Sequence, residues 1–116
     1  MPWPLPPGSV LGLFGKKPDP GRVKTRLASA FGPEFASHAH EAMLFDTLDI
    51  WAQEIPGGRL VLVYDPPDAG PWFDPFVPPR FALQPQSEGS LGDRLRTFFD
   101  GEFSDGASRV VVLGTD

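Results

Sequence analysis

Cysteine is absent from this chain of 116 residues, and histidine occurs only twice. The absence of cysteine excludes disulfides, thiolate metal sites and cysteine nucleophiles. His38 and His40 lie two positions apart on an expected helix, so they point in different directions. A histidine-based metal site or catalytic triad is therefore disfavoured, and we expect both imidazoles to be at the surface or half-buried.

Positive charge and long apolar runs are also scarce. The formal net charge is −5 and the isoelectric point is about 4.8, a balance that argues against general binding to nucleic acid or to anionic membranes. No apolar run approaches the roughly 20 residues of a membrane helix. The first residues lack the charged and apolar regions of a signal peptide. We therefore expect no nucleic-acid partner, no membrane partner and a cytoplasmic location.

Four short apolar runs alternate with segments of helical pattern. Continuous apolar runs of this kind are typical of strands that are covered on both faces of a parallel sheet. The alternation predicts an α/β protein with right-handed crossovers and a mostly parallel sheet. The fold we expect has the strand order 3-2-1-4 and three α/β/α layers. The expected strands are residues 9–15, 59–64, 81–84 and 109–113; the expected helices are residues 23–31, 33–54 and 91–103, with a single helical turn within 68–79.

The long expected helix, residues 33–54, has apolar residues at spacings of three and four. Such spacing predicts that one face of the helix lies against the core. The apolar positions are Phe35, Ala39, Met43, Leu44, Leu48, Trp51 and Ile55.

Basic residues are concentrated in one segment, residues 11–27, with the sequence LGLFGKKPDPGRVKTRL. It holds all three lysines of the chain and five of its ten basic residues. The segment begins in the first strand and continues as a loop rich in glycine and proline. Its spacing does not match the GxxxxGK[ST] pattern of a Walker A loop. A phosphate-binding loop is the preferred interpretation, and a solvated basic loop is the alternative.

Within this loop, two glycines and three cations are the candidate phosphate-binding residues. Gly15 and Gly21 let backbone N–H groups approach an anion closely. Lys16, Lys24 and Arg26 supply charge, and an arginine can grip phosphate oxygens through two bonds.

Two further segments have polar residues next to strands. In the order 3-2-1-4, strands 1 and 4 are neighbours at the switch point, where ligands bind beyond the carboxyl ends. Asp116, in Gly-Thr-Asp after the last strand, is a candidate ligand for Mg²⁺ or Mn²⁺ there. Gln86, after the third strand, is of a type that can bind the edge of a nucleobase. Ser87 or Ser90 can instead cap the helix that follows.

These motifs together resemble a bacterial family of GT-A-type glycosyltransferase-like proteins, some of which take part in arsenosugar biosynthesis. The family opens with an apolar strand and K-x-P-x-P-G-x-V-K-T-R-L, and later has Q…G-x-L-G-x-R-L and V-x-x-G-T-D. The chain matches in the right order over nearly all of residues 9–116, with residues 84–95 and 111–116 forming the later two motifs. In the first motif the matching positions are Lys16, Pro18, Pro20, Gly21, Val23, Lys24, Thr25, Arg26 and Leu27.

The resemblance implies a nucleotide-diphospho-sugar transferase fold, with a nucleotide or nucleotide-sugar as partner. It implies that the basic loop lines the nucleotide phosphates, with Lys24 and Arg26 as the main contacts. It implies that Gln86 and Gly92 lie near the base and that Asp116 holds the metal. Residues 1–8 are then a proline-rich arm, and residues 9–116 are the nucleotide-binding half of a GT-A-like domain.

Three functions remain open at this point. The first is transfer of a sugar from a nucleotide diphosphate to an acceptor. The second is nucleotidyl transfer from a nucleoside triphosphate to a phosphorylated small molecule. The third is nucleotide binding without catalysis, because members of the family continue beyond the G-T-D segment whereas this chain ends at Asp116. An ending there leaves strand 4 at an open edge of the sheet, where self-association is expected.

Overall fold

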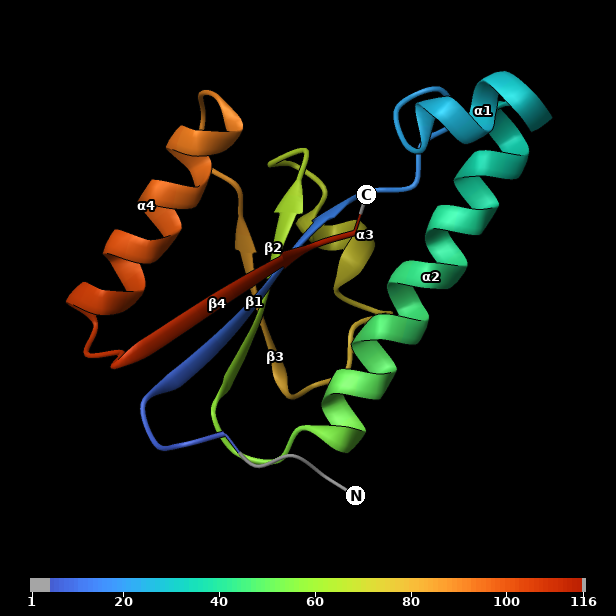
Figure 1. Cartoon of the computed structure of the whole chain (residues 1–116). Helices are drawn as coiled ribbons and strands as arrows, with labels where there is room; N and C mark the ends of the chain where they lie inside the picture. The colour runs from blue at the N-terminus through green and yellow to red at the C-terminus, as the bar shows by residue number, and fades with distance from the viewer. Residues whose placement is uncertain (1–4, 116) are drawn as a thin grey trace.

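The structure is a computed structural model, and it describes residues 5–115 (Figure 1). In this part of the chain, strands and helices alternate almost as the sequence predicts. The elements are β1 (Ser9–Lys16), α1 (Thr25–Phe31), α2 (Pro33–Glu54), β2 (Arg59–Asp65), α3 (Gly70–Phe73), β3 (Phe81–Pro85), α4 (Leu91–Ser104) and β4 (Arg109–Gly114). None of the helices in these residues is long and apolar enough to cross a membrane.

The four strands form one parallel sheet in the order β3-β2-β1-β4. This confirms the predicted α/β class and the predicted strand order. Phe14 of β1 lies between Val63 of β2 and Gly114 of β4. The carboxyl ends of all four strands therefore point to the same edge of the sheet, at the top of Figure 1. The loops that follow β1 and β3 lie at this edge, together with Thr115 after β4.

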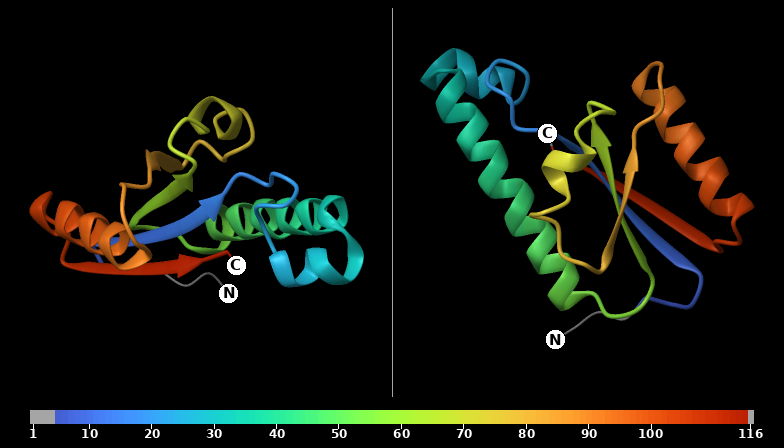
Figure 2. Two further views of the ribbon diagram at one scale, coloured as in Figure 1. Left: turned by 90° about the horizontal axis from the view of Figure 1, so that it is seen from above. Right: turned by 180° about the vertical axis from the view of Figure 1, so that it is seen from behind.

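Helices cover both faces of the sheet, so the predicted three layers are confirmed (Figure 2). Alternate residues of β1 and β2 point to opposite faces, as the period of a strand requires. One face packs against α2 and α3, and its buried core is built on Leu11, Leu13, Leu44, Leu48, Leu60, Leu62 and Phe73. The other face packs against α4 and is smaller, with Val10, Phe14, Val61, Val63 and Phe98 buried together.

Gly12 of β1 allows α4 to approach the sheet. A Cβ atom at this position would lie 2.7 Å from the ring of Phe98, closer than any real contact. Phe98 is buried, and its ring meets that of Phe14 edge to face with centroids 5.9 Å apart. The side chain missing at Gly12 therefore makes the space that the α4 aromatic fills.

Two helix predictions need correction. The first helix begins at Thr25 and not at Val23, because Lys24 adopts a left-handed conformation with φ of 50°. In α2, only the second part of the apolar pattern lies in the core. Phe35 is 54% exposed and Met43 is 55% exposed. The amino-terminal half of α2 extends past the sheet and packs on α1, where the rings of Phe31 and Phe35 are 5.4 Å apart (Figure 1).

Strand β4 was expected to be buried, and this expectation is wrong. Val110 and Val112 pack toward α4, but Val111 and Leu113 on the opposite face are 53% and 50% exposed. The reason is that α2 covers the neighbouring strands and leaves this face of β4 open. As predicted, β4 is an edge strand in the described residues. Self-association through this edge stays a prediction.

Of the predicted arm, residues 5–8 are described. Leu5 packs against the α2 side of the core, and its N–H donates to the carbonyl of Pro56 at 3.3 Å. The remainder of the arm, residues 1–4, lies outside the described residues. The boundary between arm and domain after residue 8 stays a prediction.

Candidate functional site

A basic cavity lies where the loop after β1 meets the carboxyl edge of the sheet. Its volume is about 480 Å³. Four of its six lining residues are cations and none is an acid, in a chain whose net charge is −5. The lining residues are Lys16, Arg22, Lys24, Thr25, Arg26 and Leu27. The structure thus brings three predicted phosphate-binding residues together and adds Arg22, which was not predicted.

The basic loop is anchored to its surroundings by backbone acceptors. On α2, the hydroxyl of Ser37 donates to the carbonyl of Pro18, and Nε2 of His40 donates to the carbonyl of Lys16 at 2.9 Å. His40 is fully buried, which corrects the expectation that it lies at or near the surface, whereas His38 is exposed. A buried imidazole that holds the strand end is a structural anchor of the site.

Lys24 joins the basic loop to the end of β4. Its Nζ donates to the carbonyl of Thr115 at 2.7 Å. The N–H and the hydroxyl of Thr115 both donate to the carbonyl of Phe14, each at 3.2 Å. The predicted adjacency of the basic loop and the Gly-Thr-Asp segment is therefore confirmed as far as Thr115. Asp116 itself lies outside the described residues.

The left-handed backbone of Lys24 is unusual for a residue other than glycine. This conformation costs about 1–2 kcal/mol relative to a right-handed one. The contact with Thr115 and the hydrogen bond from the Ala28 N–H to the Lys24 carbonyl, at 2.8 Å, hold the residue in it. Strain of this kind is most common at binding and catalytic sites.

A second cavity of about 420 Å³ adjoins the first and shares Lys16 with it. It lies between the ends of β1 and β4 and the start of α4. Phe14 and Leu91 give it apolar surface, and Lys16 and Arg94 give it cationic donors. The full lining is Phe14, Lys16, Gln86, Gly89, Leu91, Arg94, Gly114 and Thr115. A basic cavity thus opens beside one of mixed apolar and polar character.

Gln86 lies in the wall of the second cavity, but its amide group is already bonded within the protein. Nε2 donates to the carbonyl of Val63 at 3.1 Å, and Oε1 accepts from Nη1 of Arg94 at 3.1 Å. Its backbone N–H donates to the carbonyl of Tyr64 at 2.8 Å. Gln86 therefore ties the loop after β3 to the end of β2, and contact with a nucleobase stays a prediction.

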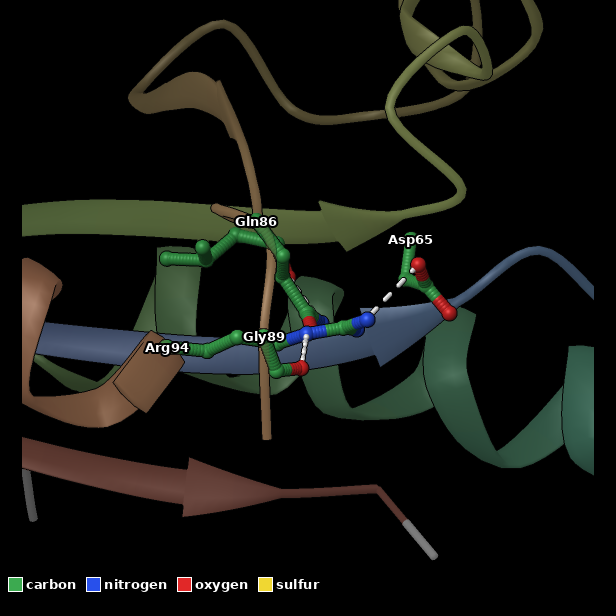
Figure 3. Close-up of polar contacts among 5 residues, drawn as sticks. Asp65, Gln86, Gly89 and Arg94 are labelled. Carbon is green, nitrogen blue, oxygen red and sulfur yellow. Dashed lines mark hydrogen bonds and ion pairs between the residues drawn. The ribbon is translucent and has the colours of Figure 1, made fainter. Parts of the chain in front are cut away.

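Arg94 and Asp65 were not predicted as site residues. Figure 3 shows the Arg94 side chain between the loop and the end of β2. Nε donates to the carbonyl of Gly89 at 3.0 Å, and Nη1 lies 3.4 Å from Oδ1 of Asp65. Arg94 is the arginine of the G-x-L-G-x-R-L motif, and Asp65 directly follows a buried strand. Both signals were available in the sequence.

The three predicted glycines line neither cavity. Gly15 faces the α2 side, where an added Cβ would lie 3.1 Å from Leu62 and 3.2 Å from Leu44. Gly21 is in the basic loop with φ of 84°, and Gly92 is in the first turn of α4. Their roles in binding phosphate or base stay predictions.

The helix-capping interpretation of the serines is confirmed for Ser90. It is the N-cap of α4, and it forms a reciprocal capping box with Asp93. The Asp93 N–H donates to the Ser90 hydroxyl at 3.1 Å, and the Ser90 N–H donates to the Asp93 carboxylate at 3.0 Å. The start of α4 beside the second cavity is therefore fixed by its own residues.

Residues 5–115 contain no group of three or more histidine, aspartate or glutamate residues that could hold a metal ion. Mg²⁺ in phosphate sites is bound through one or two carboxylates together with the phosphates themselves. The carboxylates of the described residues therefore form no cage of protein ligands alone. Binding of Mg²⁺ or Mn²⁺ together with a nucleotide stays a prediction. Asp116 is the predicted carboxylate for such a cation.

The fold closely matches that of a solved protein. The crystal structure of a "putative nucleotide-diphospho-sugar transferase" from Desulfovibrio desulfuricans G20 superposes with a TM-score of 0.84 and 31% sequence identity. The match covers 95% of this chain but 48% of the solved chain. The chain thus corresponds to about half of that protein.

Two curated proteins from Dehalococcoides mccartyi are also similar, one from strain CBDB1 and one from strain ATCC BAA-2266. Both are named dihydroxy-acid dehydratase, and each is 31% identical over 115 residues. The match takes in 94% of this chain and 20% of each relative. About four fifths of each relative therefore lies outside the match, and the name dihydroxy-acid dehydratase describes those longer proteins.

A family model identifies the protein family to which the chain belongs. The model described as "Uncharacterized protein conserved in bacteria (DUF2064)" matches residues 47–116, which include β2, the loop after β3, α4 and β4. These elements contribute Asp65, Gln86 and Arg94 to the candidate site. With the fold of a nucleotide-diphospho-sugar transferase, the chain belongs to the DUF2064 family of bacterial proteins.

Proposed function

We propose that this chain binds a nucleotide-diphosphate sugar as the nucleotide-binding half of a glycosyltransferase-like protein. One observation carries the proposal. A cavity lined by four cations adjoins a cavity with apolar walls at the carboxyl ends of β1 and β4, in a fold shared with the nucleotide-diphospho-sugar transferase. Open α/β sheets bind ligands at this kind of switch point.

The basic cavity suits the diphosphate. Arg22 and Arg26 offer planar forks of N–H donors that match phosphate oxygens, and Lys16 and Lys24 add point charges. Lys24 holds Thr115 as well, so a bound diphosphate would lie beside the end of β4. Local positive charge in a chain of net charge −5 favours a small anionic ligand over an extended one.

The second cavity suits the nucleoside. Phe14 and Leu91 provide apolar surface for a base, while backbone groups of Gly89 and Gly114 provide polar contacts at its rim. Ligand sites combine apolar walls with a few placed polar groups in this manner. Because Lys16 lines both cavities, a nucleotide spanning them would keep its phosphates on the basic side.

In the proposed reaction, an acceptor oxygen attacks the anomeric carbon of the sugar and loses its proton. The bond from that carbon to the diphosphate oxygen breaks, and the nucleoside diphosphate leaves with the electron pair. The cations of the basic cavity stabilise the negative charge that develops on the leaving group. Mg²⁺ or Mn²⁺ held by the phosphates and Asp116 would supply further charge stabilisation.

The proposal for this chain does not include a binding site for the acceptor of the sugar. The chain spans 48% of the solved relative and 20% of each curated relative. Binding of the nucleotide is therefore the step proposed for these residues, and turnover is proposed for proteins of the length of the solved relative. Nucleotide binding without turnover by this chain agrees with that division.

Calorimetric titration with UDP, GDP, ADP and CDP, each with and without Mg²⁺, tests the proposal. We expect saturable binding of at least one of them that is weakened by about tenfold in the Arg26→Ala variant, the effect of one lost charged contact, and unchanged in Arg96→Ala. Arg96 is a matched control because it loses the same charge from α4, where its side chain is 84% exposed. Failure of all four nucleotides and of their sugar derivatives to bind would refute the function.

The released product separates two kinds of transferase. A glycosyltransferase releases a nucleoside diphosphate from a nucleotide sugar, whereas a nucleotidyltransferase releases inorganic diphosphate from a nucleoside triphosphate. Incubation with each substrate class followed by anion-exchange analysis distinguishes them. The Asp116→Asn variant should mainly reduce the Mg²⁺ dependence of binding, and an unchanged response to Mg²⁺ would count against the metal assignment.

A further inference from the structure

The loop between β3 and α4, residues 86–90, forms part of the wall of the second cavity. Gln86 and Gly89 both line that cavity, and α4 begins directly afterwards with Leu91. The position of this short loop therefore determines the shape of the cavity on that side. The contacts that hold the loop in place therefore affect how the cavity binds a ligand.

Arg94 makes three contacts that join this loop to the end of β2 (Figure 3). Its guanidinium reaches the Gly89 carbonyl at 3.0 Å, the Gln86 side-chain oxygen at 3.1 Å and the Asp65 carboxylate at 3.4 Å. The first two acceptors lie in the loop, and the third lies at the end of β2. One side chain thus bridges both ends of the loop and the strand edge.

The chemistry of these contacts requires arginine. A guanidinium carries five N–H donors in a fixed planar fork, whereas an ammonium is a compact point charge. Three acceptors on two segments, the loop and the end of β2, match the fork. A lysine at this position would keep the charge but could not reach all three in the same arrangement. The Gln86 amide, fixed to the Val63 carbonyl at 3.1 Å, adds rigidity to the arrangement.

We propose that Arg94 is a positioning residue that preorganises the second cavity for the nucleoside part of the ligand and leaves the diphosphate part to the basic loop. This inference rests on the proposed function. None of the three contacts of Arg94 involves a residue of the basic cavity. Its loss should therefore weaken affinity for a nucleotide without weakening affinity for inorganic diphosphate.

The test compares Arg94→Lys with Arg96→Lys, the same substitution at an exposed position of α4. The probes are inorganic diphosphate and whichever of UDP, GDP, ADP and CDP binds the wild type most tightly. We expect Arg94→Lys to weaken nucleotide affinity by about tenfold, the loss typical of a charged hydrogen bond, with diphosphate affinity changed less than twofold. Arg96→Lys should change neither.

Amide hydrogen exchange of the ligand-free protein provides a second measurement. In Arg94→Lys, exchange at residues 86–90 should become faster while exchange in β1 and β2 stays the same. Equal loss of nucleotide and diphosphate affinity, no loss of either, or unchanged exchange in the loop would overturn the inference. If the wild type binds no nucleotide, the proposed function fails, and the exchange measurement still decides whether Arg94 holds the loop.

Discussion

The loop after β1 and the loop after β3 lie at the same edge of the sheet but are built differently. The first, with its flanking residues, places four cations around one cavity, and it is anchored by contacts with α2, with the end of β2 and with Thr115. The second carries few charges, and several of its polar groups are bonded to Arg94, to the end of β2 and to Asp93 of α4. One loop presents charge, whereas the other presents a fixed shape.

This difference indicates how the two parts of a nucleotide would be recognised. Phosphates carry charge and are held by long cationic side chains that adapt to them. A base carries little charge, so discrimination between bases depends on walls that stay in place before the ligand arrives. The contrast predicts that charge removal in the first loop and disruption of the second loop affect different parts of the ligand.

The largest effect is expected from removing two cations of the basic loop. The double variant Lys24→Ala, Arg26→Ala should weaken nucleotide binding by at least about 100-fold, since each charged hydrogen bond contributes about 1.5–3 kcal/mol. Inorganic diphosphate should lose affinity by a similar factor. Calorimetry on the double variant and on Arg26→Ala alone measures both effects, and circular dichroism checks the fold.

The Arg26→Ala variant is measured separately because Lys24 has two roles in the structure. It lines the basic cavity and also holds the Thr115 carbonyl. Arg26 lines the basic cavity and is otherwise exposed. Retained affinity in the double variant would show that the basic cavity is not the diphosphate site.

Lys16 should have an intermediate effect because it lines both cavities. The Lys16→Met variant keeps most of the length of the side chain and removes its charge. We expect nucleotide and diphosphate affinity to fall together by about tenfold, the effect of one lost charged contact. A Lys17→Met variant is the matched control, because Lys17 pairs with Asp19 at 3.6 Å and lies outside both cavities. A loss confined to one ligand would contradict the shared position.

Much of the fold could be predicted from the sequence. The apolar runs that end in glycine and proline were enough to predict the parallel sheet. Leu44, Leu48 and Trp51 were correctly expected in the core. The exposure of Phe35, Met43, Val111 and Leu113 could not be predicted. Apolar periodicity indicates which face of an element is apolar, but it does not indicate how far a neighbouring element extends to cover that face.

The site was predicted less completely. Clustered charge in one segment was enough to find Lys16, Lys24 and Arg26, which the structure places around one cavity. The partners of Arg94 lie 5, 8 and 29 positions away along the chain, so no local pattern indicates that they meet. The two segments joined by Lys24 and Thr115, 91 positions apart, were expected to be adjacent, but the hydrogen bond from the Lys24 side chain to the Thr115 carbonyl was not predicted.

A smaller and selective effect is expected from Leu91 at the rim of the second cavity. Its side chain is largely exposed, so its replacement should leave the core intact. Leu91→Ser removes apolar surface next to the proposed base and should weaken nucleotide binding by about fivefold, or roughly 1 kcal/mol. Inorganic diphosphate should bind as before. Phe103→Ser changes another exposed apolar residue of α4 and serves as control. Equal effects of the two substitutions on nucleotide binding would show that Leu91 is not part of the site.

The smallest effect on binding is expected at Ser90, where the second loop joins α4. Its hydroxyl accepts from the Asp93 N–H at 3.1 Å, and loss of such a cap costs about 1 kcal/mol of stability. Ser90→Ala should therefore lower the midpoint of thermal unfolding by about 4 °C while diphosphate affinity stays unchanged. Ser104→Ala, at the other end of the same helix, removes a serine that caps no helix start. If diphosphate affinity fell together with stability in Ser90→Ala, the two loops would be coupled, and the separation of shape from charge between them would be wrong.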